Sequence, residues 1–172
     1  MRPARIFLIG PPAAGKSTIG QKWARRLGVP FYDTDAEIER RTGIAVPDWL
    51  IQRGEGAFRE VEKAVLYKLL QESSWGIWAM GGGLPAQEDV LPYLRSEGYL
   101  LWIDPPAAWL VARLRDSLQV RPLLSALSAE QQLQLIEARR VFYRWADLHW
   151  RPSSVSEEVV YEWVKRCLST RR

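Results

Sequence analysis

The sequence has almost no cysteine, because its 172 residues include only Cys167. One cysteine excludes a fold held by internal disulfides and fits a reducing compartment. Long hydrophobic runs are also missing, and no segment approaches the roughly 20 apolar residues of a membrane helix. The apolar run at residues 6–9 is interrupted by glycine and prolines, so it does not form a signal-peptide core. We therefore expect a cytoplasmic protein without a membrane segment.

Lysine is scarce, although basic residues outnumber acidic ones by 24 to 20 and the net charge is +4. A basic balance can indicate a nucleic-acid partner. However, the arginines are dispersed, none stands in a run longer than two, and no nucleic-acid-binding motif is present. We expect a solvated surface with some anion-binding arginines and no nucleic-acid partner. The single histidine, His149, is expected to be structural.

What the sequence does contain is a regular alternation of apolar and amphipathic segments. Strands are predicted at residues 5–9, 29–35, 75–80 and 99–104. Helices are predicted at residues 16–27, 36–41, 47–52, 56–73, 88–96, 107–116 and 155–168, and in a segment that begins with a capping box at 128–131. This alternation predicts one α/β domain over residues 1–172, with a parallel sheet covered by helices on both faces. Ligands of such sheets bind at the carboxyl ends of the strands.

The segment "GPPAAGKST", residues 10–18, follows the first predicted strand and opens the first predicted helix. Gly10, Gly15, Lys16 and Ser17 fit the pattern G-x-x-x-x-G-K-[ST], whose backbone amides wrap a phosphate chain at a helix N-terminus. Its lysine reaches the β and γ oxygens, and its serine hydroxyl ligates Mg²⁺. The sequence therefore predicts a site for a nucleoside triphosphate. The residues expected to bind it are Ala13, Ala14, Gly15, Lys16, Ser17 and Thr18.

Two aspartates end the second predicted strand in "YDTD". We expect Asp33 and Asp35 to project from the same strand end, where they suit Mg²⁺ and an acceptor hydroxyl. The same residues also suit a simple cap on the following helix.

Several arginines and a triple glycine follow. Arg59 stands in "GEGAFRE", Arg121 in "RPLL" and Arg139 in "RRVFY", and guanidinium groups bind carboxylate or phosphate in a bidentate fork. The glycines at 81–83 let a backbone approach a small ligand closely. These features favour an anionic acceptor. Simpler alternatives remain open: Arg59 as a helical partner of Glu55 or Glu62, Arg121 as an exposed loop residue, Arg139 and Arg140 as solvated residues, and the glycines as a plain turn.

Six motifs in this order, "GPPAAGKST", "FYDTD", "GEGAFRE", "GGG", "RPLL" and R-x-x-x-Y, resemble the shikimate kinase family. The resemblance implies a three-layer P-loop kinase fold, with a substrate-binding segment at about residues 36–62 and a lid at about residues 115–127. It also implies ATP-dependent phosphorylation of the 3-hydroxyl of shikimate, in the pathway to the aromatic amino acids.

The resemblance further implies residue roles. Lys16, the loop amides and Arg121 would serve ATP and the transferring phosphate, while Ser17 and, through water, Asp33 would hold Mg²⁺. Asp35 would contact the shikimate hydroxyls and act as a base or orienting group. The carboxylate clamp would consist of Arg59, Gly82 and Arg139.

Some points stay open at this stage. A further lid arginine is expected at Arg113 or Arg115, and the spacing does not decide between them. We expect a monomer. The rival functions are another small P-loop kinase, acting on gluconate or a nucleoside monophosphate, and a nucleotide-binding module without catalysis.

Overall fold

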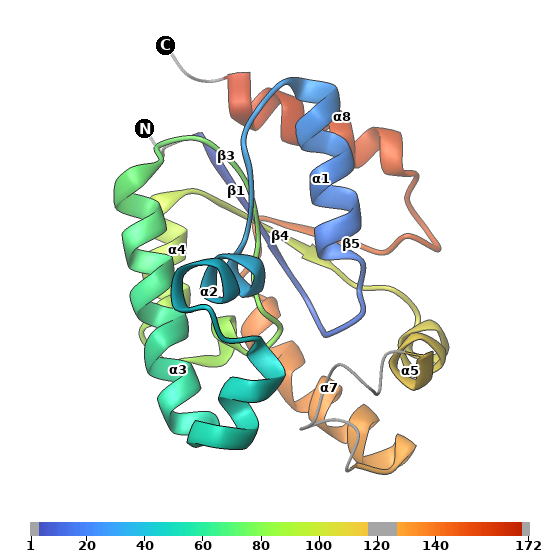
Figure 1. Ribbon diagram of the computed structural model, residues 1–172. Coiled ribbons are helices and arrows are strands. Elements are labelled where there is room, and N and C mark those ends of the chain that lie inside the picture. Colours follow the sequence, from blue (N-terminus) through green and yellow to red (C-terminus); the bar gives the residue numbers. More distant parts are fainter. Residues whose placement is uncertain (1–3, 117–126, 170–172) are drawn as a thin grey trace.

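The computed structural model describes residues 4–116 and 127–169, which form an α/β structure around one parallel sheet (Figure 1). The strand order is β2-β3-β1-β4-β5, and every neighbouring pair is parallel. The strands are β1 (Arg5–Ile9), β2 (Phe31–Asp33), β3 (Gly76–Ala79), β4 (Tyr99–Ile103) and β5 (Leu148–Trp150). All of β1 is buried, as an uninterrupted apolar strand covered on both faces should be.

Helices cover both faces of this sheet, which confirms the predicted three-layer arrangement (Figure 1). On one face, Trp23 of α1 and Val164 of α8 join a core cluster with Leu8 of β1. On the other face, Leu66 of α3 and Leu94 of α4 pack with β-strand residues in a second cluster. The helices are α1 (Lys16–Leu27), α2 (Thr34–Thr42), α3 (Val46–Glu72), α4 (Val90–Glu97), α5 (Ala107–Asp116), α7 (Ala129–Tyr143) and α8 (Glu157–Ser169), with a short 3₁₀ turn, η1 (Leu84–Ala86).

Several local predictions are confirmed. Helix α1 has the predicted bounds, and the capping box before α7 forms with both reciprocal bonds between Ser128 and Gln131. The two helices predicted at 47–52 and 56–73 join into α3 across a break at Gly54, whose φ of 80° lies in the left-handed region.

One expectation was wrong, and one strand was missed. The second strand ends at Asp33, and Asp35 already lies in the first turn of α2, so the two aspartates do not share a strand end. Strand β5 was not predicted, because it has three residues and only Trp150 among them is buried. So short a segment lacks the apolar run by which a strand is recognised.

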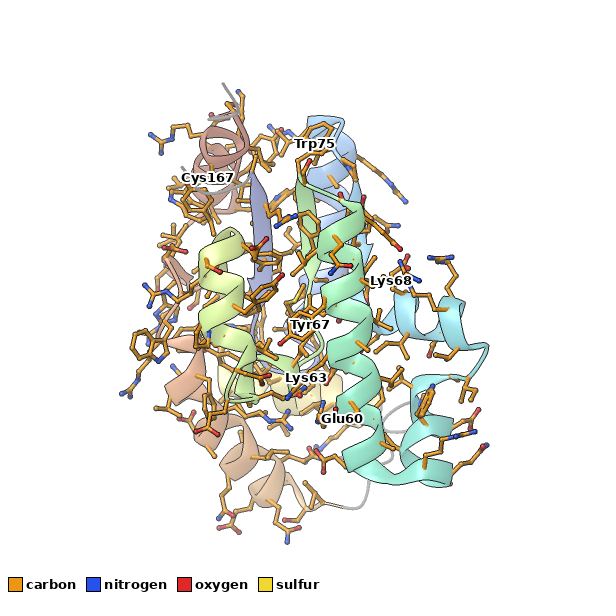
Figure 2. The ribbon with its side chains drawn as sticks, turned by 90° about the vertical axis from the view of Figure 1, so that its left-hand side faces the viewer. Glu60, Lys63, Tyr67, Lys68, Trp75 and Cys167 are labelled. Atoms are coloured by element: carbon orange, nitrogen blue, oxygen red, sulfur yellow. The ribbon has the colours of Figure 1, made fainter. Side chains whose placement is uncertain are left out.

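Figure 2 looks onto α3 and α4, with Lys63 and Tyr67 of α3 turned toward α4. Lys63 Nζ lies 2.9 Å from an Asp89 carboxylate oxygen, and the Tyr67 ring meets Tyr93 edge-on at 4.9 Å. These contacts join the two helices on their outer side. On the opposite layer, Cys167 of α8 is half-buried, and burial raises the pKa of its thiol to about 11, so it is a poor nucleophile.

No helix in the described parts of the chain combines the length and the apolar character that crossing a membrane requires. In Figure 1, α5, α7 and the start of α3 lie around the carboxyl ends of the strands. The candidate site is at this end of the sheet.

Candidate active site

The phosphate loop has the backbone that its glycines were expected to provide. Gly10 has φ 146° and Gly15 has φ 93°, and a Cβ on Gly10 would lie 2.5 Å from the carbonyl oxygen of Ile103. Ala13 also has a positive φ, 63°, which costs a residue with a Cβ roughly 1–2 kcal/mol. Ala13 therefore has a left-handed backbone conformation, and contacts in the surrounding structure must compensate its unfavourable free energy.

Lys16 is held over the loop by two of its carbonyl groups. Its Nζ donates to the oxygens of Gly10 at 2.9 Å and Pro11 at 2.8 Å, and the residue is 8% exposed. The ammonium group is thus fixed at the N-terminus of α1, where an anion is already favoured by the helix amides.

Ser17, in the first turn of α1, contacts Asp33, the last residue of β2. The Ser17 hydroxyl donates to Asp33 Oδ2, while Asp33 Oδ1 accepts from the amides of Asp35 at 3.0 Å and Ala36 at 3.3 Å. Asp33 is therefore a helix cap and a neighbour of the loop serine at once. One hydroxyl and one carboxylate oxygen are ligands that Mg²⁺ takes together with water and phosphate. The described residues contain no cluster of three or more His, Cys, Asp or Glu side chains arranged for a metal.

Two cavities meet at this end of the sheet. The first, of about 570 Å³, is here named the loop cavity; the second, of about 410 Å³, is named the arginine cavity. Asp35, Gly81 and Gly82 line both of them. A group bound in one cavity is therefore adjacent to a group bound in the other, with the Asp35 carboxylate between them.

The loop cavity is lined by all six residues of the phosphate loop that were predicted to bind the triphosphate. Arg113 of α5 also lines it, and its Nη1 donates to the carbonyl oxygen of Ala13 at 3.2 Å. Arg115 does not line this cavity, so the structure brings Arg113 to the loop. Trp109, Trp150 and Pro152 also line this cavity and supply apolar surface. The predicted residues in its wall are Ala13, Ala14, Gly15, Lys16, Ser17 and Thr18.

The arginine cavity is built around Arg59 and a buried carboxylate that the sequence analysis considered only as an ion-pair partner. Arg59 Nη1 donates to Glu62 at 2.7 Å, and Nη2 donates to Glu55 at 3.0 Å. The simpler interpretation of Arg59 is thus also true, since it forms both helical pairs. Glu62 is 1% exposed and also accepts from Gln87 at 2.9 Å.

Glu62 has a strongly shifted acidity. Burial raises the pKa of its carboxyl to about 7, against the opposing attraction of Arg59; the Asp35 carboxylate also raises it, and Arg139 lowers it. A glutamate spaced three residues from Arg59 on one helix face was visible in the sequence. Its burial was not, because burial depends on how α3 packs against the triple glycine.

Each glycine of the triple glycine leaves room for a different neighbour. A Cβ on Gly81 would lie 2.6 Å from Glu62 Oε1 and 2.9 Å from Asp35 Oδ1, and one on Gly83 would lie 2.5 Å from Arg59 Nη2. A Cβ on Gly82 would lie 3.0 Å from Pro12 of the phosphate loop. The glycines are more than a turn, since they let the charged side chains and the loop close over the backbone.

The two adjacent arginines of α7 have different surroundings. Arg139 lines the arginine cavity and forms no ion pair with any residue that the structure describes, whereas Arg140 binds Asp104. Tyr143, one turn further along, donates to the Gly82 carbonyl at 2.9 Å, and burial raises the pKa of its phenol to about 12. Arg121 and most of the predicted lid, residues 117–126, lie outside the described residues.

Comparison with known proteins agrees with this site. Residues 12–168 match the family model of shikimate kinase. The shikimate kinase of Aquifex aeolicus is 39% identical over 158 residues, which cover 92% of each chain. A solved structure of the Acinetobacter baumannii shikimate kinase in complex with shikimate has 32% identity and a TM-score of 0.81, covering 98% of this chain and 92% of that one. The Bacteroides thetaiotaomicron enzyme has 30% identity and a TM-score of 0.80, covering 96% of each chain. By the extent of these matches, the chain belongs to the shikimate kinase family.

Proposed function

We propose that this protein transfers the γ-phosphoryl group of ATP to the 3-hydroxyl of shikimate, giving shikimate 3-phosphate and ADP. The observation that carries the proposal is the position of Asp35, which lines both a cavity with a phosphate loop and a cavity with two arginines. Family membership supplies the identity of the acceptor, and the second cavity suits a small anion.

The loop cavity takes the nucleotide. Residues 13–18 direct amides at its phosphates, and Lys16 turns from its two carbonyl partners to the β and γ oxygens. Arg113 and Arg121 are the side chains we assign to the outer side of the phosphates. Ser17 and Asp33 would hold Mg²⁺, Asp33 through water, and the ion would offset charge on the phosphate oxygens.

The arginine cavity takes shikimate. Arg59 and Arg139 line this cavity together with Gly82, and Arg139 forms no ion pair with a described residue, so both guanidinium groups suit the carboxylate. Glu62 and Glu55 fix the Arg59 guanidinium before the acceptor arrives, which lowers the entropy cost of binding. Valine, proline, leucine and phenylalanine side chains of this cavity, Val46, Pro47, Leu50, Phe58 and Leu135, face the carbon ring.

Phosphoryl transfer then occurs where the cavities meet. The 3-hydroxyl oxygen forms a bond to the γ phosphorus as the bond to the β-bridging oxygen breaks, and Asp35 accepts the hydroxyl proton. The main contribution of the chain is to align the two substrates and to compensate the phosphate charge.

The test is ADP release in a coupled assay with Mg-ATP, comparing shikimate with gluconate, AMP and no acceptor. We expect turnover with shikimate, and none with gluconate, with AMP or without an acceptor. Turnover with AMP or gluconate instead would assign another acceptor. ATP binding without turnover on any of them would indicate a nucleotide-binding module. The monomeric state and the cytoplasmic location stay predictions from the sequence.

A further inference from the structure

One buried carboxylate outside both cavities binds three side chains from two separate segments, α7 and the end of β5. Asp104 follows β4 and is 6% exposed. Arg140 of α7 donates to both of its oxygens, at 2.9 and 3.0 Å, in a bidentate pair. His149 Nε2 lies 2.8 Å from Oδ2, and Arg151 Nε donates to the same oxygen at 3.2 Å.

The residues that precede and follow Asp104 and Arg151 in the sequence line the loop cavity. Ile103 and Pro105, on either side of Asp104, line the loop cavity, and so do Trp150 and Pro152, on either side of Arg151. The Asp104 amide also donates to the Trp150 carbonyl at 2.9 Å. Asp104 and Arg151 therefore hold together two strand ends that form one wall of the loop cavity.

The contact between Asp104 and Arg140 connects the cluster to the arginine cavity, because Arg139, the neighbour of Arg140 in α7, lines that cavity. Successive helical residues are turned by about 100°, so Arg139 and Arg140 cannot face the same way. When Arg140 is fixed on Asp104, the rotation of α7 about its axis is fixed, and Arg139 is turned toward the arginine cavity. The Trp102 ring, stacked on His149 at 3.8 Å with the Arg140 guanidinium 5.0 Å from its centre, packs against the cluster and restricts its movement.

We propose that Asp104 is a positioning residue that couples the two cavities. Through Arg140 it orients Arg139 for the acceptor carboxylate, and through Arg151 it makes that orientation depend on the wall of the loop cavity. The proposal rests on the assignment of Arg139 to shikimate above. Its consequence is that nucleotide bound in the loop cavity tightens shikimate binding. This tightening requires the contacts of Asp104 with both Arg140 and Arg151.

The experiment measures the dissociation constant of shikimate by titration calorimetry, with and without saturating ADP, together with KM and kcat. For the unaltered protein we expect ADP to tighten shikimate binding at least 5-fold, within the usual range of coupling between sites. For Arg140→Gln we expect the shikimate KM to rise at least 10-fold, the ATP KM to change less than 2-fold, and the ADP effect to fall below 2-fold.

Arg151→Gln tests the contact of Asp104 with Arg151 separately from its contact with Arg140. It should leave shikimate binding without nucleotide within 2-fold of normal, yet reduce the ADP effect below 2-fold. The matched control is Glu137→Gln, because Glu137 is an exposed α7 residue whose carboxylate lies 3.5 Å from Arg140 Nε, whereas Asp104 binds Nη1 and Nη2. This control should leave every constant within 2-fold. Asp104→Asn should combine both defects, and the two arginine variants test the proposal even if that variant fails to fold.

Three results would overturn the proposal. The first is an Arg140→Gln variant with a lower melting temperature but normal shikimate binding, which would make the cluster structural only. The second is an equal rise in the KM of both substrates, and the third is an ADP effect that is absent from the unaltered protein. Absence of any shikimate-dependent turnover in the unaltered protein would instead show that the acceptor is wrong, so the two failures are distinguishable.

Discussion

The Arg59 guanidinium donates to the Glu62 carboxylate at 2.7 Å, and both side chains line the arginine cavity. The pair is intrahelical, three residues apart on α3, but Glu62 is almost fully buried while Arg59 keeps part of its surface in the cavity. A cation held in this way is oriented toward the cavity before any ligand binds. The pair therefore belongs to the binding site as well as to the helix.

Arg59→Ala should impair shikimate binding and leave nucleotide binding intact. The variant removes a guanidinium from the carboxylate clamp and leaves Glu62 buried without its partner, which costs more than the hydrogen bond alone. We expect the shikimate KM, measured by steady-state assay, to rise at least 10-fold. The ATP dissociation constant, measured by titration, should change less than 2-fold.

A control for this prediction is available on the same element. Arg53→Ala removes an arginine that lies 5.2 Å from the Trp49 ring and does not line either cavity. Its kinetic constants should stay normal. If Arg59→Ala weakened ATP and shikimate equally, the assignment of Arg59 to the acceptor would be incorrect.

Glu62 should make stability depend on pH near neutrality. Its pKa is about 7 in the folded chain and 4.5 ordinarily, so between these values the folded chain binds more protons than the unfolded chain. The stabilisation from this group is complete below pH 4.5 and is lost as pH rises through 7, by roughly 3 kcal/mol in total.

Urea unfolding of the protein and of Glu62→Gln at pH 5, 6, 7 and 8 measures this effect. The amide stays neutral and can still accept from Arg59. The free energy of unfolding of the unaltered protein, relative to that of the variant, should therefore decrease from pH 5 to pH 7 and level off towards pH 8. Parallel pH profiles for the two proteins would show that Glu62 titrates normally.

Much of this site could be predicted from the sequence where the signal was local. The phosphate loop depends on glycine positions within nine residues, and the capping box of α7 on four. The burial of Glu62, the ion pair between Arg140 and Asp104, and strand β5 could not, because each depends on packing between segments far apart in the sequence. Asp35 is intermediate: its role as a site residue followed from a motif, and its place on α2 rather than on β2 did not.

Gly81→Ala should damage the site more than the fold. The new Cβ would lie 2.6 Å from Glu62 Oε1 and 2.9 Å from Asp35 Oδ1, so both carboxylates must shift. We expect kcat to fall at least 10-fold with a loss of unfolding free energy of roughly 1–3 kcal/mol. Gly56→Ala is the control, because a Cβ there meets nothing within 4 Å and Gly56 lies inside α3. An active Gly81→Ala variant would show that the two carboxylates need not hold their positions.

Asp35→Asn should lower kcat by roughly 10²–10⁴, because an amide cannot accept the proton of the attacking hydroxyl. Asp35 lines both cavities from the first turn of α2, whereas Asp48 occupies the first turn of α3 and lines neither. Asp48→Asn therefore removes an equivalent charge from a helix N-terminus without touching the site, and it should retain full activity.

Binding measurements distinguish a base from a group that only orients the acceptor. If Asp35 accepts the proton, the variant should bind shikimate and ATP within about 3-fold of normal while kcat falls, since the loss is confined to the transition state. An increase in the shikimate dissociation constant as large as the decrease in kcat would assign Asp35 to orientation alone. Near-normal turnover would remove it from the mechanism, and the proton would then have to leave with the transferred phosphate itself.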